Sequence, residues 1–135
     1  MIRFSQEILG LRLSDHSGDL IAFLHGAHGS DHHLVAFAKS HAAGLHHSSW
    51  DVGSIDEVGR GSEQMRNAGH GRGWGVGRHV LGSNYFYYVR DPWGSYAEYS
   101  HNIDYVCQRQ CNRDQQCQSN IDQGLELVPV GASCG

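Results

Sequence analysis

The aromatic run Tyr-Phe-Tyr-Tyr-Val-Arg at residues 85–90 restricts the fold most strongly, because aromatic and β-branched side chains favour a pleated strand. The next four residues, 91–94, are Asp-Pro-Trp-Gly, which place proline and glycine where a turn accepts them. Residues 95–99 are then predicted to form a second strand. The sequence therefore predicts two strands joined by a tight turn in this half of the chain.

A strand and a helix are predicted to precede this pair. Leu45–Val52 has the character of a strand, and Ser54 is a candidate N-cap for a helix that runs to Asn67 and ends at Gly69. Residues 69–77 are rich in glycine and are expected to form a loop or the approach to a hairpin. A phosphate-binding loop is not expected there, because no apolar strand precedes it and no helix follows. The predicted order over residues 44–105 is strand, helix and three strands, a βαβββ module.

The first part of the chain is predicted to repeat this order incompletely. Its predicted elements are the end of a helix at 1–10, strands at 11–13, 20–24 and 33–38, and a turn at 15–18. The strand at 33–38 is expected to be buried on both faces. Residues 1–43 would then form a first module that lacks its opening strand. The expected fold class is α+β, with paired βαβββ modules followed by a polar tail at 106–135.

The composition excludes several classes of partner. A formal charge of -4, from 10 basic and 14 acidic residues, gives no reason to expect nucleic acid or an anionic membrane as a partner. No apolar run approaches the roughly 20 residues of a membrane span, and the N-terminus lacks the pattern of a signal peptide. We therefore expect a cytoplasmic protein, in which the four cysteines are thiols rather than disulfides.

Eleven histidines call for an explanation, because histidine is a common metal ligand and acid–base residue. His47 lies on the predicted strand 45–52, Glu98 lies on the strand 95–99, and His79 lies just before the aromatic strand. Taken alone, each of these has a commoner structural interpretation, such as a satisfied core histidine. A buried glutamate between tyrosine and alanine is unusual, however, unless a cation or a metal accompanies it.

At these positions the chain resembles a known family. The segments LHHSSWDV, GRH and YFYYVRDPWGSYAEYSHNIDYV resemble the extradiol ring-cleaving dioxygenases of the vicinal oxygen chelate superfamily. The resemblance covers about residues 4–105 and follows the C-terminal catalytic domain of enzymes such as the dihydroxybiphenyl dioxygenases. It implies that residues 1–105 form a catalytic dioxygenase domain, which cleaves a catecholic ring with O2. The implied substrate resembles 2,3-dihydroxybiphenyl or an alkylcatechol.

The resemblance also implies roles for five residues. His47 and Glu98 match two ligands of the family's iron(II), for which manganese(II) is a possible substitute. His33 matches the acid–base residue, His79 a residue that lines the substrate pocket, and Tyr88 a residue that contacts the substrate oxygens. Two histidines and one carboxylate on one face of iron(II) leave the opposite face open for a catechol and O2.

No residue matches the family's first iron-binding histidine, which lies on the opening strand. The chain is therefore expected to be N-terminally truncated, with an open sheet edge that favours a homo-oligomer. The third ligand is left open, since nothing in the sequence selects among the candidates. These candidates are His16, His25, His28, His32 and a residue of a second subunit.

Two alternative functions follow from the resemblance. One is a truncated, metal-poor fragment that folds as a dimer without activity. The other is a glyoxalase-like or drug-binding member of the same fold, against which the motif at residues 88–99 argues.

Overall fold

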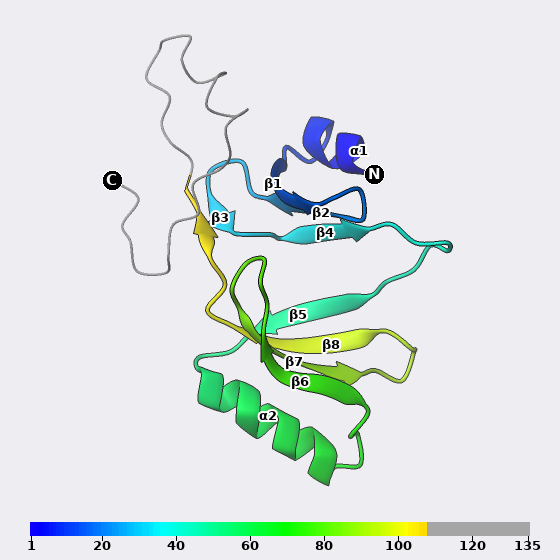
Figure 1. Ribbon diagram of the computed structural model, residues 1–135, viewed down its shortest axis with the longest axis vertical. Coiled ribbons are helices and arrows are strands. Elements are labelled where there is room, and N and C mark those ends of the chain that lie inside the picture. The colour runs from blue at the N-terminus through cyan, green and yellow to red at the C-terminus, as the bar shows by residue number, and fades with distance from the viewer. Residues whose placement is uncertain (108–135) are drawn as a thin grey trace. The chain divides into compact units, whose positions relative to one another are not determined.

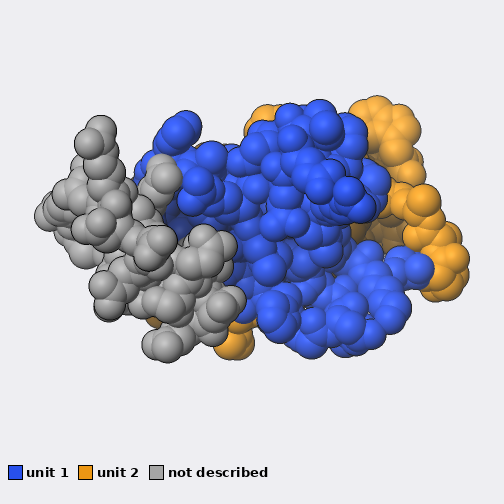
Figure 2. Space-filling view, turned by 90° about the horizontal axis from the view of Figure 1, so that it is seen from above, with its two compact units in different colours: residues 1–40, 104–135 blue, residues 41–103 orange. Residues whose placement is uncertain are grey.

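The computed structural model describes residues 1–107, which form two compact units. Among the described residues, the first unit contains Met1–Ser40 and Asp104–Cys107, and the second unit is His41–Ile103 (Figure 2). The expected boundaries at residues 43/44 and 105/106 lie close to these limits, and the assignment of catalytic modules stays a prediction. The tail expected at residues 106–135 lies almost wholly outside the described residues.

The first unit holds one helix and two small sheets. Its elements are α1 (Ile2–Glu7), β1 (Arg12–Ser17), β2 (Ile21–His25), β3 (Ser30–Asp31), β4 (Val35–Ala38) and β9 (Tyr105–Val106) (Figure 1). An antiparallel sheet has the order β1-β2-β4, and β3 pairs with β9. Leu24 and Val106 are fully buried in this unit.

Three expectations for the first unit were wrong. Strand β1 continues to Ser17, where a turn was expected from residue 15. His33 precedes β4 instead of lying on it, because β4 begins at Val35. Strand β4 is also half-buried on one face and exposed on the other, the usual arrangement in an antiparallel sheet with one face towards solvent. The expected pairing of an open edge with a second copy stays a prediction.

The second unit has the predicted order of one strand, one helix and three strands. Its elements are β5 (His47–Asp51), α2 (Ile55–Asn67), β6 (Gly73–Arg78), β7 (Tyr85–Arg90) and β8 (Tyr96–His101). The sheet order is β5-β8-β7-β6, in which β5 runs parallel to β8 and the other pairs are antiparallel. The α+β class and the βαβββ order of this module are therefore confirmed.

Helix α2 begins and ends where its sequence predicts. The Ser54 hydroxyl accepts a hydrogen bond from the Glu57 backbone N–H at 3.2 Å, and the Glu57 carboxylate accepts one from the Gly53 N–H at 2.7 Å. The first bond caps the first turn of the helix, and the second ties the residue before the cap to that turn. Beyond the last turn, Gly69 has φ +87°, a conformation that suits glycine at the end of a helix.

The helix covers one face of the four-stranded sheet (Figure 1). Val58, which is fully buried, packs with Tyr87 and Val89 of β7. Partly buried Val52, Met65, Ala97 and Tyr99 surround this cluster. Successive residues of a strand point to opposite faces, so the neighbouring residues Tyr88 and Glu98 point away from α2. The core thus assigns one face of the sheet to the helix and leaves the other for polar groups.

The glycine-rich segment, expected to be a loop or the approach to a hairpin, is a strand from Gly73 onward, and this strand forms an antiparallel hairpin with β7. Strand β6 lies so close to β7 that a Cβ on Gly73 would stand 1.9 Å from the Tyr88 carbonyl oxygen. A Cβ on Gly77 would stand 2.7 Å from the Phe86 ring. The glycines therefore permit close strand pairing, a role that glycine has where two backbones approach.

Two features of the described residues concern membrane insertion and the state of the cysteines. Among residues 1–107, no helix is both long enough and apolar enough to cross a membrane. The expectation of thiols was wrong for Cys107, which is disulfide-bonded. The other three cysteines lie outside the described residues.

Two glycines of α2 provide a matched test of how the helix packs. A Cβ at Gly59 would meet nothing within 4 Å, whereas a Cβ at Gly61 would stand 3.1 Å from the Tyr99 ring. Gly59→Ala should raise the free energy of unfolding by about 0.5–1 kcal/mol, because alanine loses less backbone entropy in a helix. Gly61→Ala should give no such gain. Urea unfolding followed by circular dichroism measures both, and equal stabilisation would contradict this packing.

Candidate functional site

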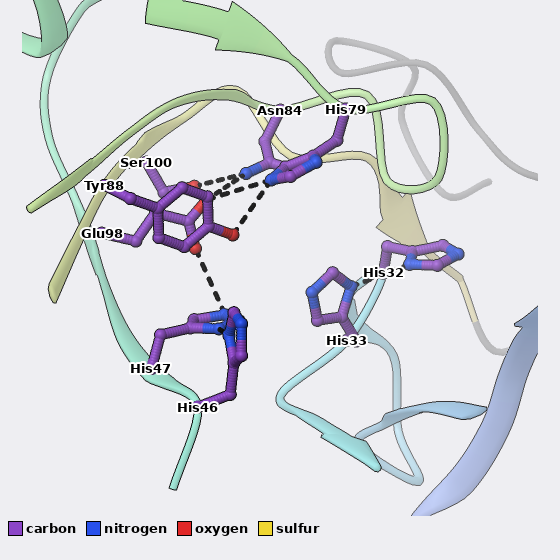
Figure 3. Close-up of polar contacts among 9 residues, drawn as sticks. All are labelled: His32, His33, His46, His47, His79, Asn84, Tyr88, Glu98 and Ser100. Atoms are coloured by element: carbon purple, nitrogen blue, oxygen red, sulfur yellow. Dashed lines mark hydrogen bonds and ion pairs between the residues drawn. The ribbon is translucent and has the colours of Figure 1, made fainter. Parts of the chain in front are cut away.

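The Glu98 carboxylate is the centre of a polar cluster in the second unit, on the sheet face opposite α2 (Figure 3). Glu98 is 3% exposed. The His47 Nε2 atom lies 3.4 Å from its Oε2 atom, and the His79 Nε2 atom lies 3.4 Å from its Oε1 atom. Each imidazole thus faces a different oxygen of one buried carboxylate.

Strand register brings these side chains together from distant positions in the sequence. The parallel pairing of β5 with β8 places Ser49 opposite Glu98, and His47 lies two residues before Ser49 on the same face. The antiparallel pairing of β7 with β8 places Tyr88 opposite Glu98. His79 directly follows β6, in the connection to β7.

Two further polar residues join the cluster. The Asn84 side-chain N–H2 group donates to Glu98 Oε1 at 3.2 Å and to the Ser100 hydroxyl at 2.9 Å. Both Asn84 and Ser100 are buried. The Glu98 oxygen that faces away from His47 therefore has two neighbours, Asn84 and His79.

The cluster favours a charged carboxylate beside a neutral imidazole. Burial opposes ionisation of Glu98, but hydrogen bonds from His79 and Ser49, together with the charge that His47 carries when it is protonated, outweigh it and keep the pKa of Glu98 below its usual value. Burial lowers the pKa of His47, and the nearby Glu98 carboxylate only partly offsets this effect. A neutral imidazole and an ionised carboxylate are the forms in which these side chains bind metal ions.

Tyr88 remains protonated in this setting. Burial and the adjacent Glu98 carboxylate raise the pKa of Tyr88 well above its ordinary value of 10.0. Its hydroxyl lies 3.1 Å from His79 Nε2, and its ring stacks on Trp74 with the centroids 4.2 Å apart. The hydroxyl thus keeps its proton beside a carboxylate and an imidazole, and it can donate a hydrogen bond.

Aromatic rings border the polar cluster. The Phe86 ring stacks on His79 with the centroids 4.0 Å apart, and Tyr96 meets Trp74 edge-on at 4.9 Å. His46 lies among Trp74, Tyr88 and Tyr96. This combination of apolar rings and a few convergent polar groups is typical of a small-molecule site.

His33 belongs to the first unit. Its Nδ1 atom lies 2.9 Å from His32 Nδ1, and its ring centroid lies 4.8 Å from that of Phe23. His32 is fully buried, and burial lowers its pKa. His33 therefore contacts a buried imidazole, that of His32, which favours its own neutral form.

An imidazole nitrogen of His47 and a carboxylate oxygen of Glu98 are donor types that bind divalent metal ions, and here they form a pair. Adjacent ligands of a metal bound at about 2.0–2.2 Å lie about 3 Å apart in octahedral geometry, and His47 Nε2 and Glu98 Oε2 are 3.4 Å apart. Within residues 1–107, no group of three or more histidine, cysteine, aspartate or glutamate side chains is placed to hold a metal. The second unit therefore offers two donors of the right chemistry.

The structure places four of the five sequence-predicted residues, His47, His79, Tyr88 and Glu98, in one cluster (Figure 3). Trp50 pairs with Tyr99 and so points to the α2 face, away from the cluster. The sequence interpretation missed Trp74, Asn84, Tyr96 and Ser100. The alternation of side chains along a strand could have identified three of them, because residues 84, 86 and 88 share one face of the sheet, as do residues 96, 98 and 100.

Comparison with curated proteins finds a close relative over most of the chain. The chain is 62% identical over 103 residues to metapyrocatechase 2 of Cupriavidus necator. The match covers 76% of this chain and 32% of that protein. The chain thus spans about a third of the length of the relative it matches. No family model matches the chain.

Solved structures share the fold. A Mn(II)-bound glyoxalase from Novosphingobium aromaticivorans has a TM-score of 0.68 and 33% identity, over 78% of this chain and 34% of that one. The 2,3-dioxygenase LapB from Pseudomonas sp. KL28 has a TM-score of 0.66 and 25% identity, over 76% and 37%. The 2,2',3-trihydroxybiphenyl 1,2-dioxygenase of Sphingomonas wittichii RW1 has a TM-score of 0.68 and 25% identity, over 82% and 40%.

The raised pKa of Tyr88 predicts a late component in the tyrosine titration. Tyr88 should keep its proton to a pH well above 10, so its contribution to the ultraviolet absorbance of ionised tyrosine should appear only beyond that pH. Tyr88→Phe should remove only the late component, and Tyr105→Phe, which removes an exposed tyrosine, should leave it in place. Circular dichroism checks that the chain stays folded. If the late component is still present in the Tyr88→Phe protein, the assignment is contradicted.

Proposed function

The chain has the vicinal oxygen chelate fold and resembles the extradiol dioxygenases of that superfamily, and from this premise we propose that it forms part of an enzyme that opens a catechol ring with O2. One observation carries the proposal furthest. His47 and Glu98, the two residues that match family ligands, lie 3.4 Å apart, and Glu98 is buried and ionised.

We propose that His47 and Glu98 hold the catalytic metal through Nε2 and Oε2. Iron(II) suits this donor set, and manganese(II) is the alternative. When bound, the metal would supply a Lewis acid for the catechol oxygens and a route for electron density from the ring to O2. Two donors hold an ion weakly, so a further ligand is needed from outside this pair. The candidates expected from the sequence stay open.

The protein groups around the pair would orient the substrate and handle its protons. Tyr88 keeps its hydroxyl proton, so it can donate a hydrogen bond to a catechol oxygen. His79 contacts both Tyr88 and Glu98, which fixes where that hydroxyl points. The acid–base role of His33, which its match to the family motif implies, stays a prediction, because His33 belongs to the first unit.

The neighbouring rings fit an aromatic substrate. Trp74, Phe86 and Tyr96 border the polar cluster and offer flat apolar surfaces. Such surfaces favour stacked or edge-to-face contact with another ring. The proposed substrate is therefore a catechol that carries an aryl or alkyl group, as in 2,3-dihydroxybiphenyl or 3-methylcatechol.

Two observations favour other candidates. The 33% identity to a Mn(II)-bound glyoxalase favours a glyoxalase-like reaction on the same fold. The second candidate is a protein of this fold that binds little metal and has no activity, since the donors His47 and Glu98 form only a pair. Assays with a catechol and with a glutathione hemithioacetal distinguish the first candidate, and metal analysis of the purified protein distinguishes the second.

Loading the protein with iron(II) under anaerobic conditions and then adding 3-methylcatechol and air tests the proposal. The expected result is a yellow ring-opened product, followed by its visible absorbance. His47→Ala and Glu98→Ala should abolish the colour and weaken metal binding by more than the roughly 10–100-fold typical of losing an outer hydrogen-bond partner.

His41→Ala is the matched control, because His41 is an exposed histidine of the same unit that no sequence motif singles out. It should leave both metal binding and product formation unchanged. Metal analysis accompanies each assay, so that loss of the ion and loss of chemistry are separated. A wild-type protein that retains iron but gives no colour would overturn the proposed reaction.

A further inference from the structure

Asn84 occupies an unusual position beside the Glu98 carboxylate. It directly precedes β7 and is 3% exposed. Alternation along the strand places it on the same face as Phe86 and Tyr88. Its amide N–H2 group donates to Glu98 Oε1 at 3.2 Å and to Ser100 Oγ at 2.9 Å, both ordinary hydrogen-bond lengths. A single side chain therefore contacts two residues of β8.

The same residue closes the loop that carries His79. The His79 backbone N–H donates to the Asn84 carbonyl at 2.9 Å, and the Arg78 guanidinium donates to the Ser83 carbonyl at 2.8 Å. Ser83 has φ 59°, a turn conformation that brings the loop back to the sheet. The backbone of Asn84 thus holds His79, while its side chain holds Glu98 (Figure 3).

The chemistry of an amide suits this place beside a carboxylate. Asn84 Oδ1 is buried and has no hydrogen-bond partner within the described residues, which is an unfavourable arrangement for a carbonyl oxygen. An apolar side chain would avoid that penalty but could not donate to Glu98. An arginine or lysine could donate but would neutralise the carboxylate. A neutral amide donates and leaves the full negative charge on Glu98 for a cation.

We infer that Asn84 is a positioning residue that fixes the Glu98 carboxylate so that Oε2 faces His47. Asn84 and His79 occupy Oε1, so a cation held by this pair meets Oε2 alone. The side chain acts through Glu98 and contacts neither metal nor substrate. The inference rests on the proposed function, in that His47 and Glu98 are taken as the metal-binding pair.

Asn84→Leu tests the inference, because leucine is similar in size and cannot donate. Manganese(II) is the probe, and electron paramagnetic resonance of the free ion gives the dissociation constant of the wild type and the variant. The expected result is binding weakened by about 10–100-fold, with the folded state verified by circular dichroism. Asn67→Leu makes the same change at an exposed site on α2 and should leave the dissociation constant unchanged.

The outcomes separate the inference from the proposed function. A folded Asn84→Leu protein that binds manganese(II) as the wild type does, while His47→Ala does not, would overturn the inference alone. A wild type that binds no manganese(II), or whose binding is insensitive to His47→Ala, would overturn both. If Asn84→Leu does not fold, Asn84→Ala removes the same donor without added volume and is measured in its place, with the same expectation.

Discussion

Burial of an ionised carboxylate at Glu98 is the constraint on which the polar face of the second unit depends. A buried charge is costly unless opposite charges or hydrogen-bond donors surround it. Here, His47 and His79 lie 3.4 Å from its two oxygens, and Asn84 donates to one of them. These partners come from β5 and from the connection between β6 and β7, so the charge is tolerated only in the folded sheet.

Helix α2 makes this arrangement possible by covering the other face. Its contact with Tyr87, Val89 and Tyr99 fixes which side of β7 and β8 forms the core. The alternation of a strand then leaves Tyr88 and Glu98 on the opposite side. The glycines of β6 let that strand approach β7 closely, and this approach places Trp74 against the Tyr88 ring. Packing on one face thus determines the chemistry of the other.

The similarity to known proteins and the local geometry support the proposal in different ways. Sequence identity of 62% to metapyrocatechase 2 indicates a ring-cleaving relative, although the chain spans about a third of that protein. The geometry adds a two-donor pair beside a protonated tyrosine and several aromatic rings. His33 lies in the first unit, so its predicted role rests on its match to the family motif.

The sequence by itself determined the local elements and the residues with chemical potential. The Ser54 cap and the aromatic strand 85–90 were readable because propensity and capping are local properties. The residues His47, His79, Tyr88 and Glu98 were singled out by the resemblance of their sequence motifs to a known family. Only the tertiary structure decided between a loop and a hairpin strand at residues 73–78, and only it showed that Asn84 contacts Glu98. Close approach of two strands and a bond across 14 residues depend on register, which no single segment of the sequence specifies.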